Sequence, residues 1–243
     1  MDEKTAIIIP ARYGSTRLPA KALIEVNGKP IIQYVWEKAK SSKLADDVII
    51  ATDNEKILSA CEKFGANAMM TSVDHKCGSD RIAEVAKKCP DIKYIINVQG
   101  DEPLITPNSI DTCISALKNT PDADVSTLIR VITDEEELNN PNVVKCVKNL
   151  AGYAMYFSRS KIPYERNAVN IEYYGHMGIY GYKREALFKM TSLPQTNLEK
   201  TESLEQLRLL DNGMKIITAV VKDDSVGIDT IEDVERFKEK LNV

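Results

Sequence analysis

The sequence lacks any long apolar run. No uninterrupted apolar stretch in its 243 residues approaches the roughly 18 residues that a helix needs to cross a bilayer. The opening residues 1–4 are too few and too acidic to begin a signal peptide. We therefore expect a protein that has no membrane partner and works in the cytoplasm.

Metal-site spacing is also missing from the cysteines and histidines. The five cysteines form no Cys-x-x-Cys pair, and the two histidines, His75 and His176, are far apart in the sequence. These spacings argue against a zinc site and for reduced thiols that mostly lie in the core. The formal net charge of −4 argues against nonspecific nucleic-acid binding over the whole surface, but it leaves room for a local basic pocket that holds a small anion.

What the chain does contain is an alternation of short β-branched runs and helical stretches. Its length and its 43% of hydrophobic residues fit one α/β domain, residues 1–243. Strand, helix, strand in repetition predicts βαβ crossovers and a Rossmann-like, mostly parallel sheet flanked by helices. Predicted strands are residues 5–9, 48–51, 94–98, 125–132, 143–147, 178–182 and 215–221, and predicted helices are residues 31–41, 82–88, 198–211 and 231–241.

The middle of the chain departs from this alternation. Residues 122–182 contain strand patterns without intervening helices, and their turn-rich centre, residues 163–174, predicts a projecting loop or arm. We interpret residues 122–182 as an elaboration of the single domain.

The loop after the first predicted strand combines cations with a glycine. Ligands of parallel sheets bind beyond the carboxyl ends of the strands, so the residues that follow each strand are site candidates. This loop contains Arg12, Gly14, Ser15, Arg17 and Lys21. Arg and Lys side chains and the N–H groups of a glycine loop favour anionic oxygens, which suits a triphosphate. The loop is neither a Walker A nor a G-x-G-x-x-G motif, and a solvated basic loop is the alternative.

Two aspartates are candidates for a magnesium site. Thr52-Asp53 follow the second predicted strand, and Asp101 follows the third in a polar segment, which places it at the crevice of the sheet. Mg²⁺ prefers one or two carboxylates together with phosphate oxygens and waters, and Asp229 before the last predicted helix could supply the second. The alternatives are a turn carboxylate for Asp101 and a plain N-cap region for Asp229.

Two further candidates have a structural interpretation that the residues alone favour. The segment before residues 82–88 suggests a helix N-terminus with Ser79 as its cap and Arg81 free to contact a base or a phosphate, but the residues alone favour a simply capped helix. His176 precedes an apolar run, and a lone histidine of this kind is more often structural than a ligand or a base.

The predicted helix over residues 198–211 offers a polar face. Leu204 and Leu207 are expected to face the core, while Glu202 and Gln206, four residues apart, share another face, with Glu205 one residue before Gln206. Carboxylate and amide groups could hydrogen-bond the hydroxyls of a polyol. An ordinary solvated helix face is the alternative.

Six segments in a fixed order give the chain a specific resemblance. Together they resemble the 3-deoxy-manno-octulosonate cytidylyltransferases, also called CMP-Kdo synthetases. The six are Ile8-Ile9-Pro10-Ala11-Arg12-Tyr13-Gly14-Ser15-Thr16-Arg17-Leu18-Pro19, Asn97-Val98-Gln99-Gly100-Asp101-Glu102-Pro103, Tyr156-Phe157-Ser158-Arg159, His176-Met177-Gly178-Ile179-Tyr180-Gly181-Tyr182, Leu204-Glu205-Gln206-Leu207-Arg208 and Gly227-Ile228-Asp229-Thr230.

This resemblance implies a fold, a reaction and a set of site residues. It implies a Rossmann-like nucleotidyltransferase fold, a homodimer built partly through the middle region, and Mg²⁺-dependent transfer of CMP from CTP to Kdo (3-deoxy-D-manno-octulosonate), with release of pyrophosphate, for lipopolysaccharide synthesis. The implied catalytic residues are Lys21, Asp101 and Arg17, and the implied metal ligands are Asp101 and Asp229. The implied nucleotide-binding residues are Ala11, Arg12, Ser15, Arg17, Lys21, Ser79, Arg81 and Gln99, and the implied sugar-binding residues are Gln99, Arg159, His176, Tyr180, Glu205 and Gln206.

Two alternatives stay open at the level of sequence. The chain could transfer CMP to another acidic sugar, such as 8-amino-Kdo, sialic acid or pseudaminic acid, because related enzymes share much of this pattern. It could also be a catalytically idle nucleotide-binding regulator, although a pure binder would have no need of both Asp101 and Asp229. No side chain can be assigned as a general base.

Overall fold

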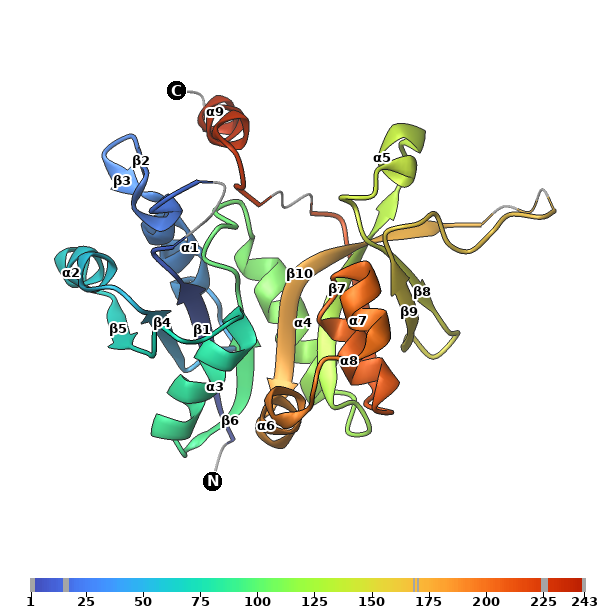
Figure 1. The fold of residues 1–243 in the computed structure, drawn as a ribbon, viewed down its shortest axis with the longest axis horizontal. Helices are drawn as coiled ribbons and strands as arrows, with labels where there is room; N and C mark the ends of the chain where they lie inside the picture. The colour runs from blue at the N-terminus through green and yellow to red at the C-terminus, as the bar shows by residue number, and fades with distance from the viewer. Residues whose placement is uncertain (1–2, 15–17, 168, 170, 224–226, 242–243) are drawn as a thin grey trace. The chain divides into compact units, whose positions relative to one another are not determined.

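The computed structural model describes residues 3–14, 18–167, 169, 171–223 and 227–241 (Figure 1). Packing divides the chain into two compact units: a first unit of residues 1–111 and 224–243, and a second unit of residues 112–223. The boundary near residue 111 lies within helix α4 (Pro107–Lys118). The single-domain organisation stays a prediction. None of the helices in the described part of the chain is both long enough and apolar enough to cross a membrane.

The first unit contains a parallel sheet. Its strands lie in the order β6 (Ile92–Asn97), β1 (Lys4–Ala11), β4 (Asp47–Thr52) and β5 (Asn67–Met70), and each pair of neighbours is parallel. Residues 6–9 of β1 are fully buried, as a strand covered on both faces requires. The mostly parallel sheet predicted from the sequence is confirmed here.

Helices and a small hairpin complete the first unit. They are η1 (Lys21–Leu23), β2 (Glu25–Val26), β3 (Lys29–Pro30), α1 (Ile31–Lys40), α2 (Glu55–Lys63), α3 (Gly78–Lys88) and α9 (Ile231–Lys240). Val234 and Phe237 of α9 pack in one buried cluster with Val26, Ile31 and Ile228. This cluster fixes the C-terminal helix, and with it the segment just before the helix, against residues near the start of the chain.

The second unit has a mixed sheet. Strand β7 (Val125–Ile132) pairs in parallel with β11 (Ile216–Val221) and antiparallel with the long strand β10 (Tyr173–Lys183). Strand β8 (Lys145–Lys148) pairs antiparallel with β10 and with β9 (Ala154–Ser158). The helices of this unit are α5 (Glu135–Asn139), α6 (Arg184–Ser192), α7 (Asn197–Glu202) and α8 (Gln206–Asp211).

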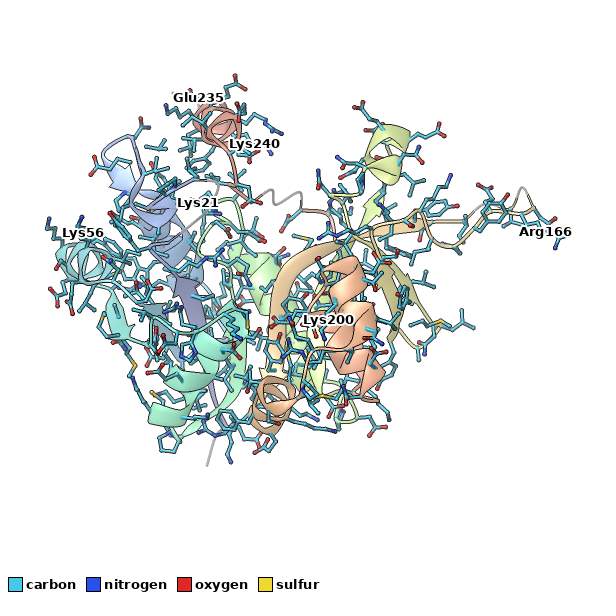
Figure 2. All side chains as sticks on the ribbon, in the orientation of Figure 1. Lys21, Lys56, Arg166, Lys200, Glu235 and Lys240 are labelled. Atoms are coloured by element: carbon cyan, nitrogen blue, oxygen red, sulfur yellow. The ribbon has the colours of Figure 1, made fainter. Side chains whose placement is uncertain are left out.

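The loop between β9 and β10 extends away from the rest of the second unit (Figure 1). Arg166 lies near its tip (Figure 2), and Tyr164 and Val169 are exposed. The arm expected at residues 163–174 is therefore present, although its last two residues, Tyr173 and Tyr174, already belong to β10.

The prediction of one helix over residues 198–211 is wrong. The chain forms two short helices, because Ser203 after α7 adopts a left-handed conformation with a φ of 52°. A left-handed residue cannot continue a right-handed helix, so α8 starts in a new direction. Leu204 and Leu207 are buried as expected, but Glu202 ends one helix and Gln206 begins the next, so they share no helical face.

Candidate active site

One ammonium group joins two aspartates that are distant in the sequence. Lys21 Nζ lies 2.5 Å from Asp101 Oδ2 and 3.1 Å from Asp229 Oδ1. Lys21 opens the 3₁₀ turn after the first loop, Asp101 follows β6, and Asp229 precedes α9. The main chain holds the two aspartate segments together, since Ile228 N–H donates to the Asp101 carbonyl at 2.8 Å. The sequence placed these residues at one end of the sheet without showing that they touch.

The segment of Asp229 is fixed by the cap of α9. Thr230 is the N-cap, and it forms a capping box with Asp233. The Asp233 carboxylate also accepts from the main-chain N–H of Asp229 at 2.9 Å, and these hydrogen bonds lower the pKa of Asp233 against the opposing effect of its burial. The N-cap residue is therefore Thr230, and the Asp229 side chain is left to face Lys21.

The chemistry of this pair fits a magnesium ion. The lysine ammonium is a compact cation, and its position shows that both carboxylates reach one cation at once. In the described part of the chain, no group of three or more His, Cys, Asp and Glu side chains is arranged to hold a metal. Two carboxylates without a complete protein cage suit Mg²⁺, which keeps several waters and takes its other ligands from substrate phosphates.

The three residues line a pocket of about 380 Å³ in the first unit, a volume within the usual range of small-molecule sites. The other residues that line it are Pro10, Ala11, Arg12, Ala22, His75, Lys76, Cys77, Gly78, Arg81, Gln99 and Gly100. Every described residue predicted to bind nucleotide is among them except Ser79. Ser15 and Arg17 lie outside the described residues.

Glycine at position 100 permits a close approach beside Asp101. A Cβ at this position would lie 2.7 Å from the Pro10 carbonyl oxygen, a distance that real Cβ atoms do not show. The ends of β1 and β6 can therefore meet at the pocket only because residue 100 has no side chain. The same neighbour limits Gly78, where a Cβ would lie 3.3 Å from the Pro10 ring.

The interpretation of Ser79 as a helix cap is wrong. Helix α3 begins at Gly78 with Cys77 as its N-cap, and Cys77 makes no side-chain cap bond. Ser79 therefore lies in the first turn, where it is buried. Helix α3 begins four residues before the predicted start at residue 82, because Gly78 and Ser79 contribute little to the hydrophobic pattern.

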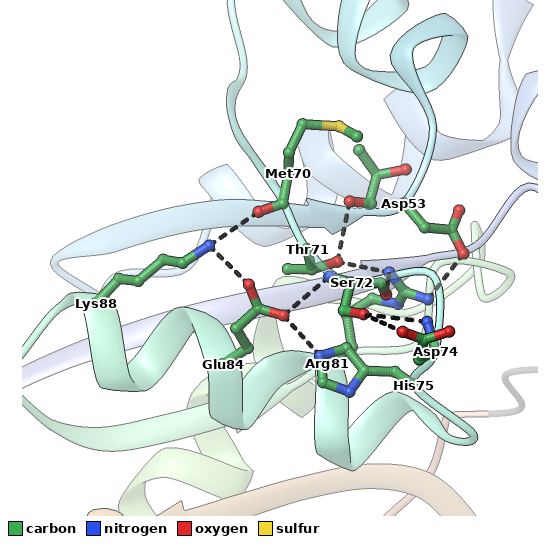
Figure 3. A network of polar contacts seen from close by, with 10 residues as sticks. Asp53, Met70, Thr71, Ser72, Asp74, His75, Arg81, Glu84 and Lys88 are labelled. Carbon is green, nitrogen blue, oxygen red and sulfur yellow. Dashed lines mark hydrogen bonds and ion pairs between the residues drawn. The ribbon is translucent and has the colours of Figure 1, made fainter.

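Arg81 is not free, as the sequence suggested it could be. Its Nη2 donates to Asp53 Oδ2 at 2.8 Å, and its Nη1 donates to Thr71 Oγ1 at 2.5 Å and to the Ser72 carbonyl (Figure 3). The residue is buried, so its charge needs a partner, and Asp53 supplies one. Arg81 still lines the pocket, but in a fixed position.

Figure 3 also shows a residue that the sequence interpretation missed. His75, which lines the pocket, has its Nε2 2.6 Å from Glu84 Oε2. Glu84 also pairs with Lys88 and accepts from Ser72 N–H, and these partners outweigh burial and lower the pKa of Glu84 to about 2. Nothing in the spacing of His75 distinguished it from a surface histidine.

The second unit contains the remaining residues predicted to bind sugar, and Arg159 is held there by carbonyl groups. Its guanidinium donates to the carbonyls of Glu202 and Pro141 at 2.7 and 3.0 Å. The Glu202 carboxylate accepts from Ser158 Oγ at 2.7 Å and from the main-chain N–H of Arg159 at 3.0 Å. Glu202 thus fixes the end of β9, a role different from the polyol contact that a shared helix face suggested.

His176 is held by protein groups on several sides. Its Nε2 lies 2.8 Å from Thr127 Oγ1, and its ring packs against Phe157 and Tyr180. Burial lowers the pKa of His176 to about 3, so the imidazole is neutral at physiological pH. Tyr180 in turn stacks on Tyr182.

Glu205 and Gln206 are placed by a buried ion pair. Arg208 donates to both carboxylate oxygens of Glu199, at 2.8 and 2.5 Å, and to the Met190 carbonyl. This arrangement ties α6, α7 and α8 together. Gln206 is buried at the start of α8, and Glu205 is partly buried beside Arg208. Gln99 alone among the predicted sugar-binding residues belongs to the first unit.

The chain is similar to known proteins along nearly its whole length. The family model for cytidylyltransferases matches residues 6–216. A 3-deoxy-manno-octulosonate cytidylyltransferase of Thermodesulfovibrio yellowstonii is 48% identical, with 98% of each chain covered, and one of Geobacter sulfurreducens is 43% identical, with 96% of this chain and 98% of the relative covered.

Solved structures agree with these relatives. The structure of a CMP:2-keto-3-deoxy-manno-octonic acid synthetase complexed with CTP matches over 99% of both chains, with a TM-score of 0.95 and 42% identity. A 4-diphosphocytidyl-2C-methyl-D-erythritol synthase of Anaerococcus prevotii, 16% identical with a TM-score of 0.66 over 99% of this chain and 97% of the other, shares the fold. The resemblance drawn from the six segments is thus confirmed, and the chain belongs to the 3-deoxy-manno-octulosonate cytidylyltransferase family.

Proposed function

We propose that this chain transfers CMP from CTP to the anomeric hydroxyl of Kdo, giving CMP-Kdo and pyrophosphate for lipopolysaccharide biosynthesis. The observation that carries the proposal is the contact of Lys21 with both Asp101 and Asp229 in a pocket of about 380 Å³, in a chain of this family. The pocket brings a phosphate-binding cation and two carboxylates to one place, as nucleotidyl transfer requires.

The reaction is an in-line displacement at the α-phosphorus of CTP. The anomeric oxygen of the sugar forms a bond to the α-phosphorus as the bond to the β-phosphate oxygen breaks, and the hydroxyl proton leaves to solvent. Such chemistry asks for positioning and charge neutralisation more than for covalent help. Arg12, Arg17 and Lys21 bind the triphosphate, together with Ala11 and Ser15, and they stabilise the charge that develops on pyrophosphate.

Asp101 and Asp229 hold Mg²⁺ in this proposal. When bound, the ion lowers the pKa of the attacking hydroxyl and neutralises phosphate charge. Lys21 then contacts the triphosphate in place of the two carboxylates. Their side chains are both partly exposed in the pocket, which leaves room for an ion and its waters.

Arg159, His176, Tyr180, Glu205 and Gln206, with Gln99, bind the sugar acid in this proposal. The guanidinium of Arg159 contacts main-chain carbonyl groups, and as a planar cation it suits the sugar carboxylate. The neutral imidazole of His176 contributes a hydrogen bond rather than a charge. Family membership supports these roles, which remain proposals.

Two further properties belong to this proposal. The chain acts as a homodimer through the second unit, in which Met155, Tyr164 and Val169 expose apolar surface at β9 and on the arm. The reaction takes place in the cytoplasm, where CTP is available.

A pyrophosphate-release assay with CTP, Mg²⁺ and a panel of sugar acids tests the function. We expect release with Kdo at a kcat/KM at least tenfold above that with sialic acid, pseudaminic acid or 8-amino-Kdo. A higher kcat/KM with one of those sugars would identify that sugar, and not Kdo, as the substrate. Calorimetric binding of CTP without release on any sugar would contradict the enzymatic function and favour a regulator.

A further inference from the structure

We infer that Asp53 is a positioning residue for CTP: its carboxylate holds Arg81 on one wall of the nucleotide pocket and the loop after β1 on another. The inference rests on the proposed function for the identity of the nucleotide. The family motifs and the pocket lining do not include Asp53, which follows β4.

The first contact of Asp53 is to Arg81. Its Oδ2 lies 2.8 Å from Arg81 Nη2, and the side chains are 14% and 3% exposed. Removing one partner of such a pair leaves an uncompensated buried charge, which the structure relieves by moving or hydrating that charge. Because the guanidinium lines the pocket, a shift of Arg81 changes the surface that the nucleotide meets.

The second contact of Asp53 is to the loop. Its Oδ1 accepts from the main-chain N–H of Tyr13 at 3.0 Å, and the Tyr13 carbonyl accepts from Ala20 N–H at 3.1 Å. The hydrogen bond from Ala20 to Tyr13 joins the two ends of the loop between Arg12 and Lys21. Asp53 therefore anchors the base of the loop that presents both of these cations to the pocket.

One carboxylate thus joins three segments of the first unit: the end of β4, the loop after β1 and helix α3. Thr71 adds a fixed point for Arg81, because its hydroxyl contacts Nη1 and also donates to the Thr52 carbonyl at 2.9 Å. With its main contacts made to protein, Arg81 can present only one orientation of its guanidinium to a ligand. Pre-organisation of this kind lowers the cost of binding, so losing it weakens CTP binding without touching the sugar.

The test is a double-mutant cycle on the full-length chain, read as CTP affinity by calorimetry in the absence of sugar. We expect Asp53→Asn to raise the Kd for CTP about tenfold or more, and to raise it little further in an Arg81→Met background. Asp111→Asn is the matched control, because Asp111 also accepts main-chain N–H groups, from Lys43 and Leu44, but does not line the pocket. It should leave the Kd unchanged.

Three results would overturn the inference. They are a Kd for Asp53→Asn within twofold of the wild type, additive effects in the cycle, or equal weakening in the Asp111→Asn control. Additivity would mean that Asp53 does not act on CTP through Arg81. If Asp53→Asn does not fold, Asp53→Glu keeps the charge but moves the carboxylate by one methylene; it should weaken CTP binding at an unchanged melting temperature, and an unchanged Kd would contradict the inference.

Steady-state kinetics separate this inference from the proposed function. Asp53→Asn should raise the KM for CTP while the KM for Kdo stays within about twofold, a split that a general loss of folded protein does not produce. If the wild-type chain turns over no Kdo but the calorimetric cycle behaves as expected, the assignment of Asp53 stands and the sugar assignment fails.

Discussion

The ammonium of Lys21 lies within hydrogen-bonding distance of both Asp101 and Asp229, 2.5 and 3.1 Å from their carboxylate oxygens. In this arrangement the lysine neutralises two carboxylates that would otherwise repel each other. The same group is the proposed ligand of the triphosphate. In the proposed function Lys21 exchanges its partners when nucleotide and metal bind, which makes its removal informative.

Replacing Lys21 by methionine should change metal and nucleotide binding in opposite directions. Without the ammonium, the two carboxylates attract a divalent cation more strongly, so Mg²⁺ affinity in the absence of CTP should rise severalfold by calorimetry. The KM for CTP should rise by tenfold or more, with a much smaller change in the KM for Kdo, because the lost contact is to phosphate. An increase confined to the KM for Kdo would contradict the role of Lys21.

Replacing Gly100 by alanine should separate the two strand ends that form the pocket. The added Cβ would meet the Pro10 carbonyl at 2.7 Å, so the segment that presents Asp101 must shift. A displacement near 1 Å at a reacting centre can cost on the order of 10²-fold in rate, and we expect a loss of about this size in pyrophosphate release. Unchanged kcat in Gly100→Ala at an unchanged melting temperature would show that the close approach has no catalytic importance.

The sequence predicted the first unit more completely than the second. Buried strands such as residues 5–9 and 48–51 are predictable from their β-branched runs. Parallel topology then predicts that Asp101 and Asp229 lie at the same edge of the sheet. The contact of both with Lys21, and the engagement of Arg81 by Asp53, depend on side-chain geometry that no spacing encodes. Helix α2 and strand β5, which have nine and four residues, were not predicted.

In the second unit, one residue explains why the prediction of a single helix over residues 198–211 is wrong. The apolar spacing of Leu204 and Leu207 is correct for a helix, and both are buried, but Ser203 takes a left-handed conformation that serine rarely adopts. Periodicity reports which residues face the core and does not report where the helix axis changes direction. The proposed face of Glu202 and Gln206 failed for this reason.

His176 should make the stability of the protein depend on pH. Its pKa is about 3 in the folded chain and about 6.5 when unfolded, so below pH 6.5 only the unfolded state takes up the proton. The free energy of unfolding is therefore unaffected by protonation of His176 above pH 6.5. It falls as the pH drops from 6.5 toward 3, by at most about 1.4 kcal/mol per pH unit.

Urea unfolding of the wild type and of His176→Gln at pH 7, 6, 5 and 4 measures this dependence. The variant keeps a group that can hydrogen-bond Thr127 but does not titrate, so its stability should fall less steeply over this range. Parallel curves for the two proteins would show that the imidazole is protonated in the folded state.

The buried pair of Glu199 and Arg208 should matter more for folding than for chemistry. Glu199→Gln leaves the guanidinium with only the more distant carboxylate of Glu205, 3.7 Å away, as a counter-charge, and we expect a loss of about 3 kcal/mol in the free energy of unfolding. Glu235→Gln is the control, because its pair with Lys238 is largely exposed and should contribute less than about 1 kcal/mol. If both variants lost the same free energy of unfolding in urea titrations, burial would not make the pair of Glu199 and Arg208 more stabilising than the exposed pair.

The central claim is that Asp101 and Asp229 together bind the metal that drives CMP transfer, and Asp101→Asn tests it most directly. The substitution keeps the size of the side chain and removes its charge. We expect pyrophosphate release from CTP and Kdo to fall about 10²-fold or more at saturating Mg²⁺, while the melting temperature stays near that of the wild type. Near-normal turnover in the folded variant would remove Asp101 from the mechanism and contradict the account.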